Sequence, residues 1–175
     1  MCGYYTRFGG EFAIYPFPDK ATTKLINKLV GNRRIAYDTT RLAKLAGISE
    51  GECIAKWGVE GEFFFPKKAH LLGKVWWKDA ILDSKRHPIR QPDMINFWRI
   101  DEDNGSLKVM MDECSFYHYD LWLVYIRDII LKPRGYTLVG SVSWGGDDAY
   151  DIGVITINND QNICVDKWGQ QRRIL

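Results

Sequence analysis

Residues 116–165 have the sequence FYHYDLWLVYIRDIILKPRGYTLVGSVSWGGDDAYDIGVITINNDQNICV, the most regular stretch of the chain. Large apolar residues recur in its first third at the spacing of one face of an α-helix. These residues are Trp122, Tyr125, Ile126, Ile129 and Ile130. We expect a helix over residues 118–132 that begins near Ser115 or Asp120. Pro133 has no backbone N–H to continue the helix, so the helix is expected to end there.

The rest of this stretch has the pattern of β-strands. Residues 136–144 alternate between an apolar and a polar side, which predicts a half-buried strand. Residues 152–158 are rich in β-branched side chains, and residues 163–165 form a last short apolar run. Short turns between successive strands predict an antiparallel meander, and the apolar face of the 118–132 helix is expected to lie across it.

Two further segments are expected to add strands to this sheet. Residues 3–16 alternate loosely and predict a first strand beside the meander. Residues 95–100 and 106–111 flank an Asn-Gly pair at 104–105, which predicts a β-hairpin closed by a type I′ turn. The fold expected from these patterns is a single α+β domain over residues 1–175 with an antiparallel sheet.

The middle of the chain is expected to contribute short helices. Asp19 is a candidate N-cap for a helix over residues 20–30, and a second helix over 41–46 would end at Gly47. Residues 58–66 favour a short strand or an aromatic loop that Pro66 closes.

The segment around Gly47 also has the spacing of a helix–turn–helix, a motif of DNA-binding proteins. Arg41, Lys44 and Lys56 are the basic residues that accompany it. Pairs of short helices around a glycine turn are common in proteins, so the favoured interpretation is a pair of packed helices without a role in DNA binding.

The amino-acid composition and the net charge limit the kinds of protein that this chain can be. With 46% hydrophobic and 14% aromatic residues, the chain of 175 residues is expected to be globular. A net charge of +2 gives no bulk attraction to nucleic acid, so nucleic acid is not expected as the sole partner. The sequence shows neither a signal peptide nor an apolar run that could span a membrane, so we expect a cytoplasmic protein with reduced thiols and no membrane partner.

The chain resembles a family of small uncharacterised proteins of bacteriophages and bacteria. The resemblance lies in the GYYT segment at residues 3–6 and in the pattern FYHYxxWLxxI…LKPxGYxLxGxVxWxG…DIGxI, which begins at Phe116. Residues 17–95 lie outside this resemblance and are expected to be a variable insertion. The resemblance implies an accessory protein of a phage or mobile element, one that inhibits a host protein such as a component of a bacterial defence system; it assigns no catalytic residue and no cofactor.

An acidic loop at residues 145–151 is a candidate metal site. Its carboxylates are Asp147, Asp148 and Asp151, and carboxylate oxygens are ligands of Mg²⁺ and Ca²⁺. They lack the spacing of a calcium-binding loop, so a hairpin turn with solvated charges is the favoured interpretation. A metal-dependent hydrolase that uses these residues remains an alternative.

The sequence contains none of the common catalytic motifs. There is no Gly-x-Ser-x-Gly, no phosphate-binding Gly-Lys-Ser/Thr loop and no His-Glu-x-x-His. His118 could serve as a general base with Asp120 or Glu113, although a hydrogen-bonded histidine at the start of a helix is the more ordinary interpretation. We therefore expect a non-catalytic protein without a cofactor.

An excess of aromatic residues beside basic residues predicts a binding surface. The candidate binding residues are Tyr5, Arg7, Trp76, Trp77, Lys85, Arg86, Arg90 and Tyr150. Tyr, Trp and Arg are enriched in protein interfaces, so a host protein is the expected partner. Binding of a small nucleotide through the aromatic residues and the basic 85–90 segment is an alternative, and self-association is a further option.

Overall fold

The computed structural model describes residues 4–32, 34–66, 76–83, 85–109 and 115–175. The chain forms two compact units, one made of residues 1–32 and 94–175 and the other of residues 33–93. The second unit lies within the predicted insertion at 17–95, whereas residues 17–32 belong to the first unit. Organisation of 1–175 as a single domain stays a prediction.

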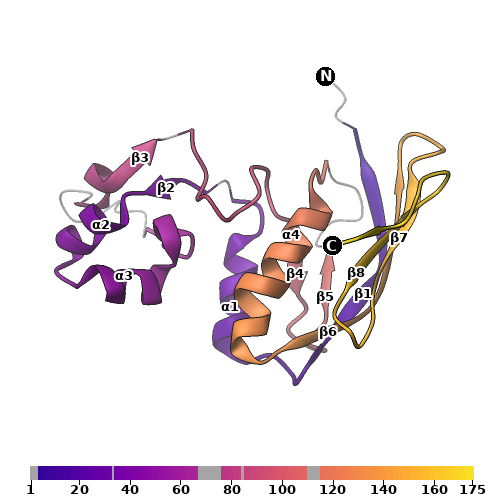
Figure 1. Cartoon of the computed structure of the whole chain (residues 1–175), viewed down its shortest axis with the longest axis horizontal. Helices are drawn as coiled ribbons and strands as arrows, with labels where there is room; N and C mark the ends of the chain where they lie inside the picture. The colour runs from indigo at the N-terminus through magenta and orange to yellow at the C-terminus, as the bar shows by residue number, and fades with distance from the viewer. Residues whose placement is uncertain (1–3, 33, 67–75, 84, 110–114) are drawn as a thin grey trace. The chain divides into compact units, whose positions relative to one another are not determined.

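The first unit is built on a seven-stranded antiparallel sheet with the order β4-β5-β1-β6-β7-β8-β9 (Figure 1). Its strands are β1 (Thr6–Tyr15), β4 (Trp98–Ile100), β5 (Leu107–Val109), β6 (Thr137–Gly146), β7 (Ile152–Ile157), β8 (Ile163–Lys167) and β9 (Arg173–Ile174). The C-terminal meander and the N-terminal strand share one sheet, because β1 pairs with β6 over ten residue pairs. The predicted α+β class with an antiparallel sheet is confirmed.

The central helix starts later and ends later than its sequence suggests. It begins as α4 (Tyr119–Tyr125), continues as a π-helix (Ile126–Leu131) and ends as a 3-10 turn (Lys132–Arg134). The predicted N-cap at Ser115 is wrong, because His118, with a φ of 55°, is the N-cap. The predicted end at Pro133 is also wrong, because this residue sits in the 3-10 turn, where its missing N–H costs no helical hydrogen bond.

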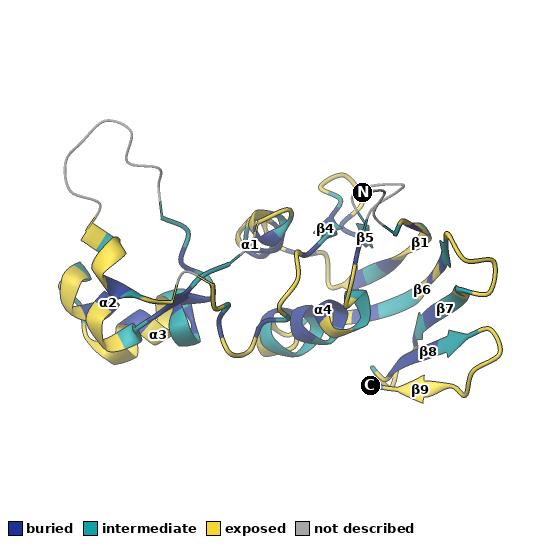
Figure 2. Ribbon diagram, turned by 90° about the horizontal axis from the view of Figure 1, so that it is seen from above, coloured by how far each residue is buried: buried dark blue, intermediate teal, exposed yellow. Residues whose placement is uncertain are grey.

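The apolar face of this helix packs on the sheet as expected. Trp122 and Ile126 are buried, with exposed fractions of 1% and 0%. They share a core with Phe12, Leu138 and other residues of the inner side of the sheet. Each such side chain contributes about 1.5–3 kcal/mol when it is fully buried. In Figure 2 the helix lies on the concave side of strands β6, β7 and β8.

The helix α1 (Lys20–Leu29) covers the β4 edge of the sheet. The Asp19 side chain accepts a hydrogen bond from the Thr22 N–H, which confirms the predicted N-cap. Farther along, the Asn27 amide donates to the carbonyl of Ile100 over 3.0 Å and accepts from its N–H over 2.8 Å. The Asn27 side chain thus occupies the hydrogen-bonding positions that a further strand would use.

The predicted β4–β5 hairpin is present, but its turn differs from the expectation. The strands are joined by residues 101–106, and only Gly105 of the Asn-Gly pair has a positive φ, at 71°. Asn104 instead uses its side chain to accept a hydrogen bond from the N–H of Ser106 over 3.0 Å. The type I′ turn was therefore a wrong prediction, because it requires both central residues in the left-handed region.

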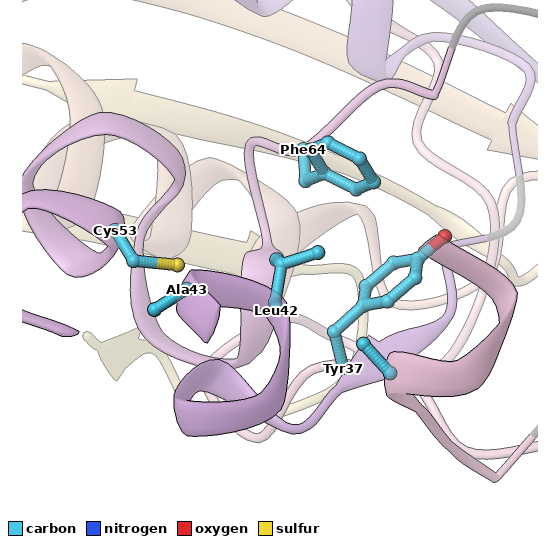
Figure 3. Packing of buried hydrophobic residues seen from close by; sticks show 6 residues of the cluster. Tyr37, Leu42, Ala43, Cys53 and Phe64 are labelled. Carbon is cyan, nitrogen blue, oxygen red and sulfur yellow. The ribbon is translucent and has the colours of Figure 1, made fainter. Parts of the chain in front are cut away.

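The second unit has a small core of its own between short elements. They are β2 (Ala36–Tyr37), α2 (Thr39–Ala46), α3 (Glu50–Trp57), a 3-10 turn (Val59–Gly61), a second 3-10 turn (Trp76–Ala80) and β3 (Ile81–Asp83). The core consists of Tyr37, Leu42, Ala43, Cys53, Phe64 and Ala80 (Figure 3). The alternative of a strand over 58–66 is wrong, since this segment is a 3-10 turn followed by loop.

None of the helices in the described ranges has the length and apolar character needed to cross a membrane. The strands β1 and β6 and the helix α1 each have ten residues. The core of the first unit contains buried residues of the sheet and of both helices, such as Ile26 of α1 and Trp122 of α4.

Candidate functional site

One side of the sheet in the first unit carries no helix, and we call it the open face. Alternation along the strands sends register partners to the same side of a sheet. Arg7 of β1, Gly145 of β6 and Ile152 of β7 are such partners, and they lie opposite the side that packs on α4. Among the described elements of this unit, none lies on the open face (Figures 1 and 2).

The central rows of the open face combine small side chains with the exposed Glu11 of β1. Gly9, Ser143 and Val154 form one row across three strands. Glu11, Ser141 and Thr156 form the next row, on the side away from the 145–151 loop. The strand ends near the 145–151 loop carry most of the larger side chains.

Large side chains at this end project into solvent. The exposed fractions are 75% for Tyr150, 68% for Trp168 and 44% for Tyr5. The N–H of Asp147 donates to the carbonyl of Tyr5, and the N–H of Tyr5 donates to the Asp147 carboxylate, which places Tyr5 beside the acidic loop. The N–H of Trp168 donates to the carbonyl of Ile152 over 2.9 Å.

Two adjoining hollows lie beside Trp168, and Tyr150 lines one of them. One, of about 440 Å³, is lined by Tyr150, Asp151 and Trp168. The other, of about 530 Å³, extends over the open face and is lined by Ser143, Ile152, Val154 and Trp168 among other residues. Trp168 borders both hollows, so its ring is the central feature of this end of the sheet.

The carboxylate of Asp151 connects several segments beside Tyr150 and Trp168. Its Oδ1 atom lies 2.6 Å from Nζ of Lys167. The indole N–H of Trp144 also points at Oδ1, over 3.5 Å, and the Tyr4 hydroxyl donates to Oδ2. One carboxylate thereby joins the N-terminal segment, β6 and β8.

These contacts change the acidity of two groups. Burial by itself raises the pKa of Asp151, but the hydrogen bonds from Lys167, Tyr4 and Trp144 together outweigh it and leave that pKa lowered. The hydrogen bond to Asp151 raises the pKa of Tyr4, since a phenolate would face the carboxylate. Asp151 is therefore an anion held by fixed donors, with Tyr4 as its neutral partner.

Gly146 is the reason that the Tyr4–Asp151 contact can form. A Cβ atom at this position would lie 2.0 Å from the Tyr4 hydroxyl oxygen and 2.6 Å from Oδ2 of Asp151. Only a residue without a side chain leaves that space free.

The three carboxylates of the acidic loop, the candidate metal ligands, each accept hydrogen bonds from different donors. Asp147 accepts from the N–H of Tyr5 over 2.8 Å, and Asp148 accepts from the N–H of Tyr150 over 2.9 Å. Asp151 is held by Lys167 and Tyr4 as described. Within the described ranges, no group of three or more His, Cys, Asp or Glu residues is arranged to hold a metal ion.

The basic residues predicted at 85–90 belong to the second unit, where two of them form ion pairs. Arg86 pairs with Glu60, and Arg90 pairs with Glu62, whose side chain is completely buried. Glu60 also accepts from the N–H of Ile89 over 2.8 Å. These pairs hold the segment around Pro88 against the 58–62 turn and neutralise both guanidinium groups.

The remaining candidates of the second unit lie near its core. Trp77 contacts the Tyr37 ring edge-on, whereas Trp76 borders Phe64 and stays 40% exposed. The side chain of Lys85 is exposed. Tyr5, Arg7 and Tyr150 belong to the first unit, so the predicted binding residues form two groups.

Trp168 and Lys167 were not expected from the sequence. The available signal was a tryptophan in the polar segment Asp166–Gln171, directly before Gly169, where no apolar neighbour explains it as a core residue. No sequence pattern connects Tyr4 with Asp151, because 147 positions separate them.

Comparisons with protein-family models, with curated proteins and with solved structures gave no match to this chain. The resemblance to small phage and bacterial proteins therefore stays a prediction.

Proposed function

We propose that this protein functions by binding another protein through the end of the open face that carries Trp168. The observation that carries the proposal is the pair of aromatic side chains, Trp168 and Tyr150, which stay mostly exposed while lining adjoining hollows. Aromatic residues of this kind supply most of the binding energy in protein interfaces, particularly beside a hollow that a partner side chain can fill.

The surroundings of the two aromatic residues suit a rigid interface. The Asp151 network fixes the strand ends beneath them, so little conformational entropy would be lost there on binding. Arg7 and Ile152 extend the surface across β1 and β7 on the same side.

The partner class follows from the resemblance described above. We propose a bacterial host protein, with a component of a defence system as the first choice, and an inhibitory, non-catalytic role in the host cytoplasm. The protein would then be an accessory factor of a phage or mobile element.

The two alternative functions have less support from the geometry. Sequestration of a nucleotide by the 85–90 segment would require Arg86 and Arg90 to leave Glu60 and Glu62. Hydrolysis by the acidic loop would require Asp147, Asp148 and Asp151 to leave three different sets of donors. No specific observation favours either function over protein binding.

The proposal is tested by affinity capture from lysates of bacteria that carry known defence systems. The wild-type protein is expected to retain one stoichiometric partner, and Trp168→Ala is expected to weaken that complex by about 30-fold, the effect of a strong interface residue. Tyr117→Ala, which removes an exposed tyrosine of the first unit outside the open face, serves as the control.

Retention of the same partner by Trp168→Ala and Tyr150→Ala with unchanged affinity would reject the open face as the binding surface. A partner that is captured but continues to function in plaque assays would reject inhibition while leaving binding intact. The two parts of the proposal can thus fail separately.

A further inference from the structure

Trp168 differs from the other tryptophans of the chain in its surroundings. Each of the others contacts at least one aromatic ring, as Trp144 contacts Tyr119 at a centroid distance of 5.4 Å. Trp168 is 68% exposed, and among the described residues no aromatic ring contacts it. Tyr150 is 75% exposed and has no ring contact within the same ranges either. Packing in a core therefore accounts for neither side chain.

These two rings line one hollow of about 440 Å³, where the β6–β7 and β8–β9 connections meet (Figure 1). Because the rings do not contact each other, a group of a ligand can enter beside both of them. Aromatic rings with a carboxylate nearby are typical of sites for organic cations, since the face of each ring attracts positive charge. The other lining residues are Asp148, Asp151, Lys167, Gly169 and Gln170.

The charged groups of the hollow leave one carboxylate without a counter-charge. Asp151 and Lys167 form an ion pair over 2.6 Å, so their charges largely cancel. The Asp148 carboxylate accepts a hydrogen bond from the N–H of Tyr150 over 2.9 Å, which fixes its position and leaves its charge. In the part of the chain that the structure describes, no cationic side chain forms an ion pair with Asp148. The hollow therefore attracts a cation and repels an anion.

An arginine side chain combines the two contacts that this hollow offers. Its guanidinium group is planar, stacks on aromatic faces and donates hydrogen bonds to carboxylates. It is also less strongly hydrated than the ammonium group of lysine, so less hydration is lost when it leaves water. Arginine is in addition enriched at protein interfaces.

We propose that this hollow binds an arginine side chain of the partner protein. The guanidinium group stacks on the ring of Trp168 and donates to the carboxylate of Asp148, and the ring of Tyr150 covers part of the side chain. This inference rests on the proposed function, because it names the chemical group of the partner that the Trp168 end of the open face recognises.

The test uses the full chain and two small probes, so it does not require the partner. Nα-acetyl-arginine amide is titrated into isotope-labelled protein, and the indole N–H signal that is lost in Trp168→Leu reports binding by nuclear magnetic resonance. Nα-acetyl-citrulline amide has nearly the same shape but no charge. The arginine probe is expected to bind about tenfold more tightly than the citrulline probe, the combined effect of one cation–π contact and one exposed ion pair.

Variants separate the charge from the ring. Asp148→Asn keeps an acceptor for the N–H of Tyr150 and is expected to weaken binding of the arginine probe about threefold without a change for the citrulline probe. Trp168→Leu is expected to weaken the arginine probe about fivefold, and Trp168→Phe, which keeps an aromatic face, less. Asp103→Asn, an exposed aspartate of the first unit outside the hollow, serves as the control and should change neither affinity. Circular dichroism establishes that each variant is folded.

Equal affinity of the wild type for both probes would overturn the inference, as would an arginine affinity that stays the same in Asp148→Asn and Trp168→Leu. A partner captured through Trp168 would still support the proposed function in that case, and its contact would be apolar. Conversely, binding of the arginine probe without any captured partner would reject the proposed function and support the preference of the hollow for a cation.

Discussion

The side chain of Asp151 connects the N-terminal segment of the first unit with strand β8 near the C-terminus. It receives Tyr4 from the N-terminal segment and Lys167 from β8, and it is itself in the connection between β6 and β7. Gly146 keeps the space for the Tyr4 hydroxyl empty. A partly buried carboxylate with donors from several segments is costly to disturb, because each donor would lose a charged acceptor.

Replacing Asp151 by Asn is expected to lower the free energy of unfolding by about 1–2 kcal/mol at pH 7. The value is below that of a fully buried ion pair because the Lys167 side chain is 34% exposed and water screens it. Urea denaturation provides the measurement. Tyr4→Phe, which removes one donor and keeps the ion pair, should cost less. Equal stability of wild type and Asp151→Asn would show that the network contributes nothing.

The same substitution should also change the pH dependence of stability. The pKa of Asp151 is lowered in the folded state from its ordinary value near 4, so its ionised form stabilises the fold above that value. This contribution disappears as the pH falls through the folded pKa. The difference in unfolding free energy between wild type and Asp151→Asn should therefore shrink between about pH 5 and pH 2. A difference that stays constant over this range would contradict the assignment.

At the scale of elements, side-chain amides complete the sheet where strands end. Gln161 accepts from the N–H of Leu138 over 2.9 Å and donates to its carbonyl over 3.0 Å. Asn27 does the same for Ile100 at the outer edge of β4. Both amides reproduce the pattern of a neighbouring strand and leave no backbone group at these positions without a partner.

Gln161→Ala is expected to lower the free energy of unfolding by about 1–3 kcal/mol, because two backbone groups of Leu138 lose their partners. Gln161 also has a φ of 62°, a conformation that costs other residues about 1–2 kcal/mol more than glycine. Gln161→Gly should therefore be more stable than Gln161→Ala, although it lacks the amide as well. Chemical denaturation of the three proteins tests the order. If Gly and Ala variants were equally stable, the backbone conformation would carry no strain.

At the scale of the whole molecule, the chain is divided by packing. Residues 33–93 have their own core around Leu42 and Phe64. Separate cores allow separate unfolding, since neither core needs the other to be buried.

Leu42→Ala is expected to destabilise the second unit by about 2–5 kcal/mol, because it leaves a cavity in a small core. Hydrogen exchange should then accelerate in residues 33–93 and stay unchanged in β6 and β7. Leu138→Ala, a matched substitution in the first unit, should give the reverse pattern. Uniform acceleration by either variant would show that the whole chain unfolds as one domain.

The periodic spacing of apolar residues along the chain predicted the fold reliably. The period of 3.6 residues at Trp122 and Ile126 and the alternation over residues 136–144 both predicted the packed side correctly, because a buried face of a helix or strand requires these spacings. Local boundaries were less predictable. The start at His118 and the passage through Pro133 depend on backbone conformations that the packed sheet stabilises, and no pattern in the sequence encodes them.

The candidate site was predictable only in part. Tyr5, Arg7 and Tyr150 were selected for their residue type, whereas the position of Trp168 beside Tyr150 required the pairing of β7 with β8. The same holds for the 85–90 segment, where the sequence shows cations and the fold supplies the carboxylates of Glu60 and Glu62 that neutralise them.

The amino-acid order was thus sufficient for the main strands, the central helix and the helix that Asp19 caps, since these depend on contacts within a few residues. The open face, the Asp151 network and the division into two units depended on contacts between residues far apart in the chain. Such contacts form only when the sheet assembles, because a carboxylate cannot select its donors until folding has brought them within a few ångströms.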